Sequence, residues 1–188
     1  MELPTNVRNR LVLENCEHSF SIKDCILIND QVGVPIVFDT HHYECYKQLH
    51  PNEKFEPADY YIGYILQSWH KRGIKPKFHV SEQGSGRCGH HSDFIETIPD
   101  YLLNIPDLYA TDIDIMIEAK MKEQAIFKLY VKYPFLSCKK SDTNIEWNPG
   151  ETIVERRKRE HDEALEVLNW NIFILSITDV ILIRTHQW

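Results

Sequence analysis

Carboxylate and imidazole side chains recur in this chain at positions where they could share metal ions. The candidates are Glu14, Asp39, His42, His79, His91 and Glu118. Mixed oxygen and nitrogen ligands suit Zn²⁺, Mn²⁺ or Fe²⁺, whereas all-oxygen sets suit Mg²⁺ or Ca²⁺. Neighbouring metals that share a bridging carboxylate can hold both the attacking and the leaving oxygen in phosphodiester hydrolysis. One strand-end carboxylate alone is usually a cap or an ion-pair partner, but the set together predicts a divalent-metal site.

The elements that would position these side chains alternate between strands and helices. The predicted strands span residues 10–15, 34–39, 76–80 and 113–118, and the predicted helices span residues 22–30, 58–72, 94–103 and 119–132. A histidine-rich loop is expected after the second strand and a glycine-rich loop after the third. This alternation is typical of βαβ units around a parallel sheet.

Each predicted strand also ends in a residue with useful chemistry. These residues are Glu14, Asp39, His79 and Glu118. In a parallel sheet or barrel the carboxyl ends of the strands share one rim, so the four side chains are expected to converge on one site.

The sequence changes character after the last of these helices. Residues 1–133 form the predicted βα domain, and residues 134–188 form a C-terminal extension. In the extension a polar loop is expected at 137–150, a charged helix at 154–169, and apolar segments at 172–175 and 180–183.

Composition narrows the class of protein. The chain has 188 residues, of which 43% are hydrophobic and 26% charged, as in an ordinary folded domain. That length is below the roughly 250 residues of a complete (β/α)₈ barrel. No apolar run reaches the roughly 18–20 residues of a membrane helix, so no membrane contact is expected. The net charge of -7 argues against a protein that binds nucleic acid through a basic surface alone.

Cysteine usage and the N-terminus bear on the compartment. The five cysteines form no C-x-x-C motif, and an odd number cannot pair completely within one chain. Reduced thiols in a reducing compartment are the simpler interpretation. The first residues lack a basic segment followed by an apolar one. An intracellular location, in the cytoplasm or nucleus, is therefore expected.

Five short motifs in this chain resemble consecutive motifs of the UV-damage endonuclease family. They are L-V-L-E-N at 11–15, P-I-V-F-D-T-H-H at 35–42, P-K-F-H-V-S-E at 76–82, H-S-D-F-I at 91–95 and D-I-M-I-E-A-K-M-K-E-Q-A at 114–125. They occur in the family's order and cover about residues 3–130. The F-D-x-H-H and I-M-I-E-A-K-x-K-E-Q-A strings are the most specific.

The resemblance implies a fold, an activity and a set of ligands. Family members are similar to endonuclease IV: a TIM barrel with up to three divalent metals, Mn²⁺ or Zn²⁺, at its C-terminal face. They nick UV-damaged double-stranded DNA on the 5′ side of pyrimidine dimers and 6-4 photoproducts. By the resemblance, Glu14 bridges two metals, while Asp39, His79 and Glu118 complete one of their coordination spheres.

The remaining family positions concern a further metal and a lysine. His42 and His91 match ligands of that further metal. Lys77 matches an active-site lysine that stabilises phosphate charge or modulates the metals. His41 adjoins a ligand but is expected to face the other way and to orient it. Position 16 is a cysteine, where an acidic residue is common in the family.

The matching region corresponds to the C-terminal half of a (β/α)₈ TIM barrel, its last four βα units. The family's earlier strands, with further histidine ligands, have no counterpart here. The chain is thus predicted to be a truncated or split UV-damage endonuclease completed by a second polypeptide, or a half-barrel that self-associates while its extension covers the open edges. An inactive or metal-binding remnant, and another xylose isomerase-like barrel enzyme, remain as alternatives.

Overall fold

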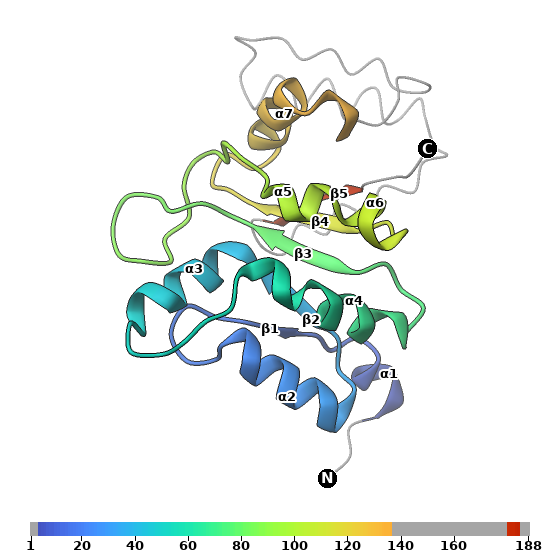
Figure 1. The fold of residues 1–188 in the computed structure, drawn as a ribbon. Helices are drawn as coiled ribbons and strands as arrows, with labels where there is room; N and C mark the ends of the chain where they lie inside the picture. The colour runs from blue at the N-terminus through green and yellow to red at the C-terminus, as the bar shows by residue number, and fades with distance from the viewer. Residues whose placement is uncertain (1–3, 137–179, 185–188) are drawn as a thin grey trace.

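A sheet whose strands lie side by side in chain order forms the centre of the molecule (Figure 1). The computed structural model describes residues 4–136 and 180–184. The strands are β1 (Leu13–Glu14), β2 (Ile36–Asp39), β3 (Lys77–Val80), β4 (Asp114–Glu118) and β5 (Val180–Arg184). The first four are parallel, and β5 pairs with β4 in the antiparallel direction. The predicted parallel sheet is therefore confirmed, with a strand of the extension added at its edge.

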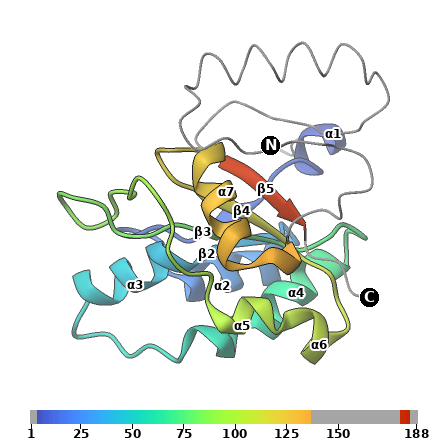
Figure 2. The same ribbon diagram turned by 90° about the horizontal axis from the view of Figure 1, so that it is seen from above.

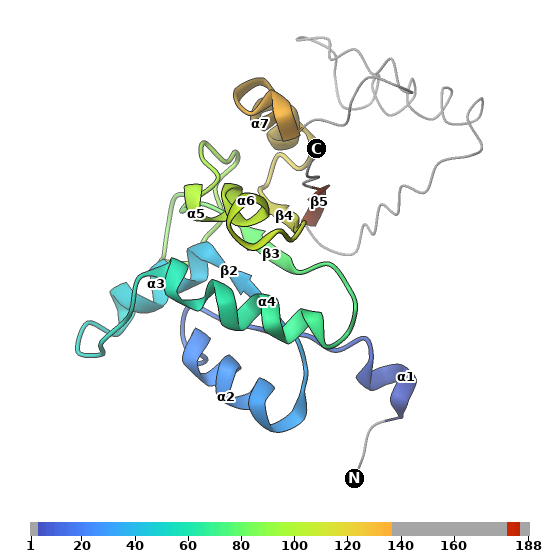
Figure 3. The same cartoon turned by 45° about the vertical axis from the view of Figure 1, so that its right-hand side comes forward.

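Helices follow the parallel strands, as expected for βα units. They are α1 (Thr5–Arg8), α2 (Ile22–Val32), α3 (Thr40–Leu49), α4 (Ile62–His70), α5 (Asp100–Leu103), α6 (Ile105–Tyr109) and α7 (Glu123–Lys132), with 3₁₀ turns η1 (Ala58–Tyr61) and η2 (Pro134–Leu136). Figure 2 shows α2, α4 and α6 on the same side of the sheet, and Figure 3 shows α2 and α4 side by side. The described residues thus form four βα units, the pattern of half a (β/α)₈ barrel.

The hydrophobic core lies between the sheet and these helices. Phe38, Phe78 and Ile115 are fully buried and stand next to one another on β2, β3 and β4. Ile65 of α4 is equally buried within the same cluster. Because successive side chains of a strand point to opposite faces, the intervening residues, such as Asp39, face away from this core.

The histidine-rich segment after β2, which we predict as a loop, is helical, so that prediction is wrong. Asp39 caps α3, because its Oδ1 accepts hydrogen bonds from the backbone N–H groups of His41 and His42, both at 2.8 Å. Capping of this kind satisfies donors that a helix leaves free in its first turn. The polar composition of the segment suggests a loop, but the aspartate that precedes it is a typical N-cap residue and indicates the start of a helix.

Two other predicted helices begin later than expected. Residues 94–98 are not helical, and α5 starts only after Pro99. Glu82 Oε1 accepts the N–H groups of Glu96 and Thr97, both at 2.8 Å, and so holds this segment to the end of β3. Residues 119–122 form a turn, since the N–H of Lys120 donates to Ser92 O at 3.1 Å instead of starting α7.

Most predictions for the extension lie outside the described residues. This applies to the polar loop at 137–150, the charged helix at 154–169 and the apolar segment at 172–175. The last apolar segment is described, and it forms β5 beside β4 as a strand. Within the described part of the chain, every helix is too short or too polar to cross a membrane.

Candidate metal centre

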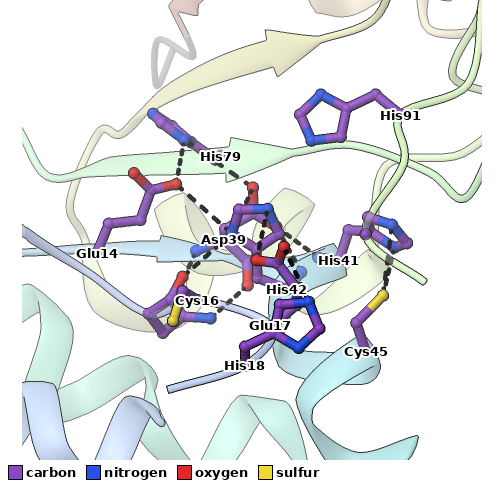
Figure 4. Close-up of polar contacts among 12 residues, drawn as sticks. Glu14, Cys16, Glu17, His18, Asp39, His41, His42, Cys45, His79 and His91 are labelled. Carbon is purple, nitrogen blue, oxygen red and sulfur yellow. Dashed lines mark hydrogen bonds and ion pairs between the residues drawn. The ribbon is translucent and has the colours of Figure 1, made fainter. Parts of the chain in front are cut away.

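The carboxyl ends of the four parallel strands bring the predicted ligands to one rim of the sheet (Figure 4). Glu14, Asp39 and Glu118 are the last residues of β1, β2 and β4. His79 is the last but one of β3 and stands opposite Asp39 in the β2–β3 register. Strand alternation turns all four side chains to the face away from the hydrophobic core.

His79 lies at the centre of the cluster. Its Nδ1 is 2.9 Å from Glu14 Oε1, 2.9 Å from Glu118 Oε1 and 3.9 Å from Asp39 Oδ2. An imidazole nitrogen carries at most one hydrogen, so it cannot satisfy three carboxylates with separate hydrogen bonds. A divalent cation among these oxygens and this nitrogen would satisfy all of them.

Asp39 supports the same conclusion through its second oxygen. Its Oδ1 caps α3, whereas its Oδ2 is buried and has no hydrogen-bond partner. The backbone around it is fixed, because Asn15 exchanges two hydrogen bonds of 2.9 Å with the Asp39 N–H and carbonyl groups. Leaving a buried carboxylate oxygen unpaired costs free energy, which a bound cation would recover.

His42 and His91 approach the cluster from the elements beside the rim. His42 is in the first turn of α3, with its Nδ1 3.9 Å from both Glu14 Oε1 and Asp39 Oδ2. His91 follows the glycine-rich loop, and its Nε2 is 3.5 Å from Glu118 Oε2. The two imidazole rings are 6.0 Å apart.

Two groups of described residues have ligand atoms close enough to hold a metal ion. One is Glu14, Asp39 and His42; the other is Glu14, His79 and Glu118, and within each group the ligand atoms lie within 4.8 Å of one another. Glu14 belongs to both groups, the geometry that a bridging carboxylate requires. Carboxylates and imidazoles are the donor set that Mn²⁺ and Zn²⁺ accept.

The electrostatics of the centre reflect its crowding. Burial lowers the pKa of His79, but hydrogen bonds to Glu118 and Glu14 outweigh it and raise that pKa to about 10. For Glu118, burial acts to raise the pKa, and the hydrogen bond from His79 reverses this and lowers it. Burial raises the pKa of Asp39, and the neighbouring His42 only partly opposes the shift. In the absence of a cation, a protonated His79 therefore holds the carboxylates together.

Lys77 is on the same face of β3 as His79 but two residues earlier. Its Nζ forms an ion pair with Asp114 Oδ2 at 2.6 Å and lies 5.9 Å from the centre of the Trp69 ring. The structure thus places Lys77 in a layer of polar side chains beneath the rim, rather than among the ligands.

One carboxylate beside the centre, that of Glu17, is not among the ligands that the sequence predicts. Glu17 Oε2 is 3.9 Å from His42 Nε2, on the side opposite to Glu14. Gly89, whose φ is +92°, leaves room for Glu17, because a Cβ there would lie 3.0 Å from its carboxylate oxygen. The available signal was the position of Glu17, one residue after the cysteine that replaces a common acidic residue.

His41 and His90 have neighbours other than the metal cluster. His41 is buried, and its Nε2 is 3.5 Å from the Cys45 sulfur (Figure 4). His90 is exposed, and its Nδ1 is 3.2 Å from Ser85 O within the glycine-rich loop.

Comparison with known proteins gives a consistent result. The family model of UV-endonuclease UvdE matches residues 1–148. A protein of Acanthamoeba polyphaga mimivirus that is assigned as a UV-damage endonuclease is 37% identical over 133 residues, which are 70% of this chain and 39% of that protein. The UV DNA damage endonuclease of Bacillus velezensis is 30% identical over 132 residues, which are 68% of this chain and 39% of that protein.

A solved structure shows the same arrangement of elements. The crystal structure of SacUVDE superposes with a TM-score of 0.53 at 27% sequence identity, covering 70% of this chain and 43% of that one. The chain therefore spans less than half the length of the relatives that it matches.

Proposed function

Because the chain belongs to the UV-endonuclease UvdE family, we propose that its metal centre cleaves a phosphodiester bond in UV-damaged double-stranded DNA. The cut falls on the 5′ side of pyrimidine dimers and 6-4 photoproducts. The observation that carries the proposal is the sharing of Glu14 by two groups of metal-ligand geometry. Two neighbouring metal sites that share a carboxylate can stabilise both the attacking and the leaving oxygen when a phosphodiester bond is cleaved.

Different residues of the rim would be ligands of different ions. By the family resemblance, Glu14 would be shared by two ions, Asp39, His79 and Glu118 would complete the coordination of one of them, and His42 and His91 would hold a further ion. The distances in this chain instead group Asp39 and His42 with Glu14, and His79 and Glu118 with Glu14. When bound, Mn²⁺ or Zn²⁺ supplies the Lewis acidity that activates water and neutralises phosphate charge.

Binding of a metal ion at the centre would require His79 to lose its proton. His79 can present Nδ1 as a ligand only in its neutral form, and its pKa of about 10 means that a cation must displace a bound proton. Asp39 offers its buried Oδ2, which has no hydrogen-bond partner, without giving up its capping of α3. A bound cation could therefore use Oδ2 while Oδ1 continued to cap α3.

Lys77 is proposed to act from the layer beneath the ligands. Held by Asp114 at 2.6 Å, it places a positive charge on the same face as His79. That charge lies two residues, or roughly 7 Å, along the strand. From there it stabilises phosphate charge or modulates the metals, as the family resemblance implies.

Bound cations also bear on how an acidic chain meets DNA. The formal charge of -7 omits the positive charge of the metals themselves. We infer that the ions, rather than a basic surface, supply the local attraction for the phosphate backbone.

The open edge of β1 is the proposed site of further barrel strands. β1 is two residues long and pairs only with β2 among the described strands, and Leu11 and Val12 just before it are exposed. More than half of each matched relative's length lies outside the match. We propose that strands of a second polypeptide, or of a second copy, pair with this edge; closing a full barrel would also require β5 to leave β4, which it now covers.

The test is a nicking assay with purified full-length chain, Mn²⁺ or Zn²⁺, and UV-irradiated or untreated plasmid. The expected result is nicking that needs metal and irradiation, with ends mapping 5′ to the photoproducts. The oligomeric mass is measured on the same sample, and an assembly larger than a monomer is expected. Metal binding without nicking by any assembly would contradict the proposed activity and leave a metal-binding remnant. Nicking by a monomer would contradict only the proposed pairing.

A further inference from the structure

A second cluster of reactive side chains lies beside the metal centre, on the buried side of α3. Cys45 is only 1% exposed. Its sulfur is 3.5 Å from His41 Nε2 and donates to Gln83 Oε1 at 3.8 Å. This thiol is therefore packed against the segment that leaves β3 toward the glycine-rich loop.

Cys88 reaches the same place from the glycine-rich loop. Its thiol donates to Gln48 Oε1 at 3.8 Å, on α3 just beyond Cys45. The next residue, Gly89, donates its N–H at 3.0 Å to Gln83 Oε1, the same oxygen that faces Cys45. Burial and the neighbouring Cys88 thiol raise the pKa of Cys45 to about 12. The two thiols are thus neighbours, one buried and one partly exposed.

We propose that Cys45 and Cys88 form a disulfide when the protein meets a peroxide. The partly exposed Cys88 thiol is oxidised first: hydrogen peroxide converts it to a sulfenic acid and releases one water. The Cys45 sulfur then attacks the Cys88 sulfur, its proton leaves with the hydroxyl as a second water, and the S–S bond forms. Two thiols lose two electrons, and one peroxide is reduced to two waters.

The other described cysteines are poorly placed for this reaction. Cys25 is 2% exposed within the hydrophobic core. Cys16 is partly exposed, but its sulfur accepts the N–H groups of Ser19 and Phe20, both at 3.2 Å. A metal site at the pair is also disfavoured, because no group containing Cys45 or Cys88 meets metal-ligand geometry within the described residues.

The consequence of the crosslink depends on where the two cysteines are attached. Cys45 is on α3, the helix that carries His42 in its first turn. Cys88 is in the loop that leads to His91. A disulfide would fix that loop on α3 and restrict the separation of the two imidazoles. This consequence rests on the proposed metal centre, whereas the disulfide itself does not.

Peptide mapping after treatment of the full-length protein with hydrogen peroxide tests the proposal. A Cys45–Cys88 linked peptide is expected in the wild type and in a Cys16→Ser control, with loss of two free thiols that dithiothreitol restores. Cys88→Ser and Cys45→Ala proteins are expected to yield no intramolecular link. The oxidised wild type is expected to melt about 5–10 °C higher than the reduced form, since a disulfide constrains the unfolded chain.

Several results would overturn the proposal. One is a linked peptide that joins Cys88 to Cys16, Cys25 or Cys138. Another is irreversible oxidation of Cys88 while Cys45 remains a free thiol. Protection of both thiols by added Zn²⁺ in the chelator-treated protein, with no link formed after the zinc is removed, would indicate a metal site instead. Failure of the nicking assay alone leaves the disulfide standing, so the two proposals fail separately.

Discussion

Two layers of polar side chains lie on the same face of the sheet, and they differ in how their charges are balanced. At the rim, three carboxylates, those of Glu14, Asp39 and Glu118, surround the single nitrogen His79 Nδ1. In the layer beneath, one lysine, Lys77, meets one aspartate, Asp114, at 2.6 Å. The Lys77–Asp114 pair is balanced in charge, whereas the rim carries an excess of acceptor oxygens.

This difference separates a structural ion pair from a candidate metal centre. A buried pair with matched charges contributes little net stability, but removing one partner leaves the other charge buried and destabilises the fold. At the rim three carboxylates face a single imidazole nitrogen, so their negative charge exceeds the positive charge beside them, and a bound cation would balance it. The direction of the charge imbalance, rather than burial alone, distinguishes the two layers.

The largest effect is expected at Asp39. In Asp39→Asn the amide can still cap α3 through its oxygen, but the negative charge on the buried ligand is lost. We expect metal content to fall and metal-dependent nicking to decrease by at least about 100-fold, as for loss of a metal ligand or its support. Elemental analysis and plasmid nicking measure these effects, and Glu118→Gln is expected to behave in the same way.

Asp114→Asn is the matched control for this prediction, because it removes the carboxylate of the other layer. The metal content of Asp114→Asn is expected to equal that of the wild type. Equal metal loss in both variants would remove the distinction between the layers.

The second prediction concerns pH and His79 in the metal-free protein. The pKa of His79 is raised to about 10 in the folded chain, compared with about 6.5 in the unfolded chain. The protonated imidazole therefore stabilises the folded state fully below about pH 6.5, and this contribution is lost as the pH rises through about 10. We expect the stability difference between wild type and His79→Gln to shrink by a few kcal/mol over this interval.

Urea unfolding in the presence of a chelator, at several pH values between 6.5 and 10, measures that difference. A difference that stays constant with pH would show that the rim does not hold a proton on His79. With Mn²⁺ present the trend in metal affinity is opposite, since loading needs the neutral imidazole, and affinity is expected to rise with pH.

The third prediction addresses the lower layer. Asp114→Asn leaves Lys77 without its ion-pair partner in a mostly buried place, and we expect a loss of about 1–3 kcal/mol in the free energy of unfolding. The control is Asp112→Asn, which removes the more exposed Lys75–Asp112 pair at 3.8 Å, where a change below about 1 kcal/mol is expected. Urea unfolding of both variants is the measurement, and equal losses would contradict a special role for the lower pair.

The smallest effect is expected at Glu17, at the outer side of His42. Its carboxylate is 3.9 Å from His42 Nε2 and 22% exposed, so solvent screens its charge. Glu17→Gln is expected to weaken Mn²⁺ binding by about two- to fivefold, as calorimetric titration would measure. Glu44→Gln, at an exposed position of α3 paired with Lys47, is expected to change nothing. A loss as large as that of Asp39→Asn would make Glu17 a direct ligand.

The two edges of the sheet extend the comparison between regions. β4 is covered along its length by the antiparallel β5, which pairs residue by residue from Asp114–Arg184 to Glu118–Val180. β1 has no such cover among the described residues. The one described strand of the extension therefore covers the β4 edge, and β1 is the strand at the other edge among the described residues, where the further pairing is proposed.

The local fold was largely predictable because local patterns dictate it. The strands that carry Glu14, Asp39, His79 and Glu118 appear at the expected places, with bounds that differ by a few residues. The end of α2 at Gly33, whose φ is +67°, also follows from a glycine. Long-range hydrogen bonds, such as that from Lys120 to Ser92, delayed α7 and were not visible in the pattern.

The sequence by itself determined which chemistry gathers at the rim, because the strand period and the parallel order place four strand ends together. Only the tertiary structure decided how each group is used. It gave Asp39 a capping oxygen and a free buried oxygen, and it paired Lys77 with Asp114 in a layer of its own. It also brought Cys45 and Cys88 together from α3 and a distant loop. Side-chain pairing across strands and loops depends on register and packing, which no local pattern encodes.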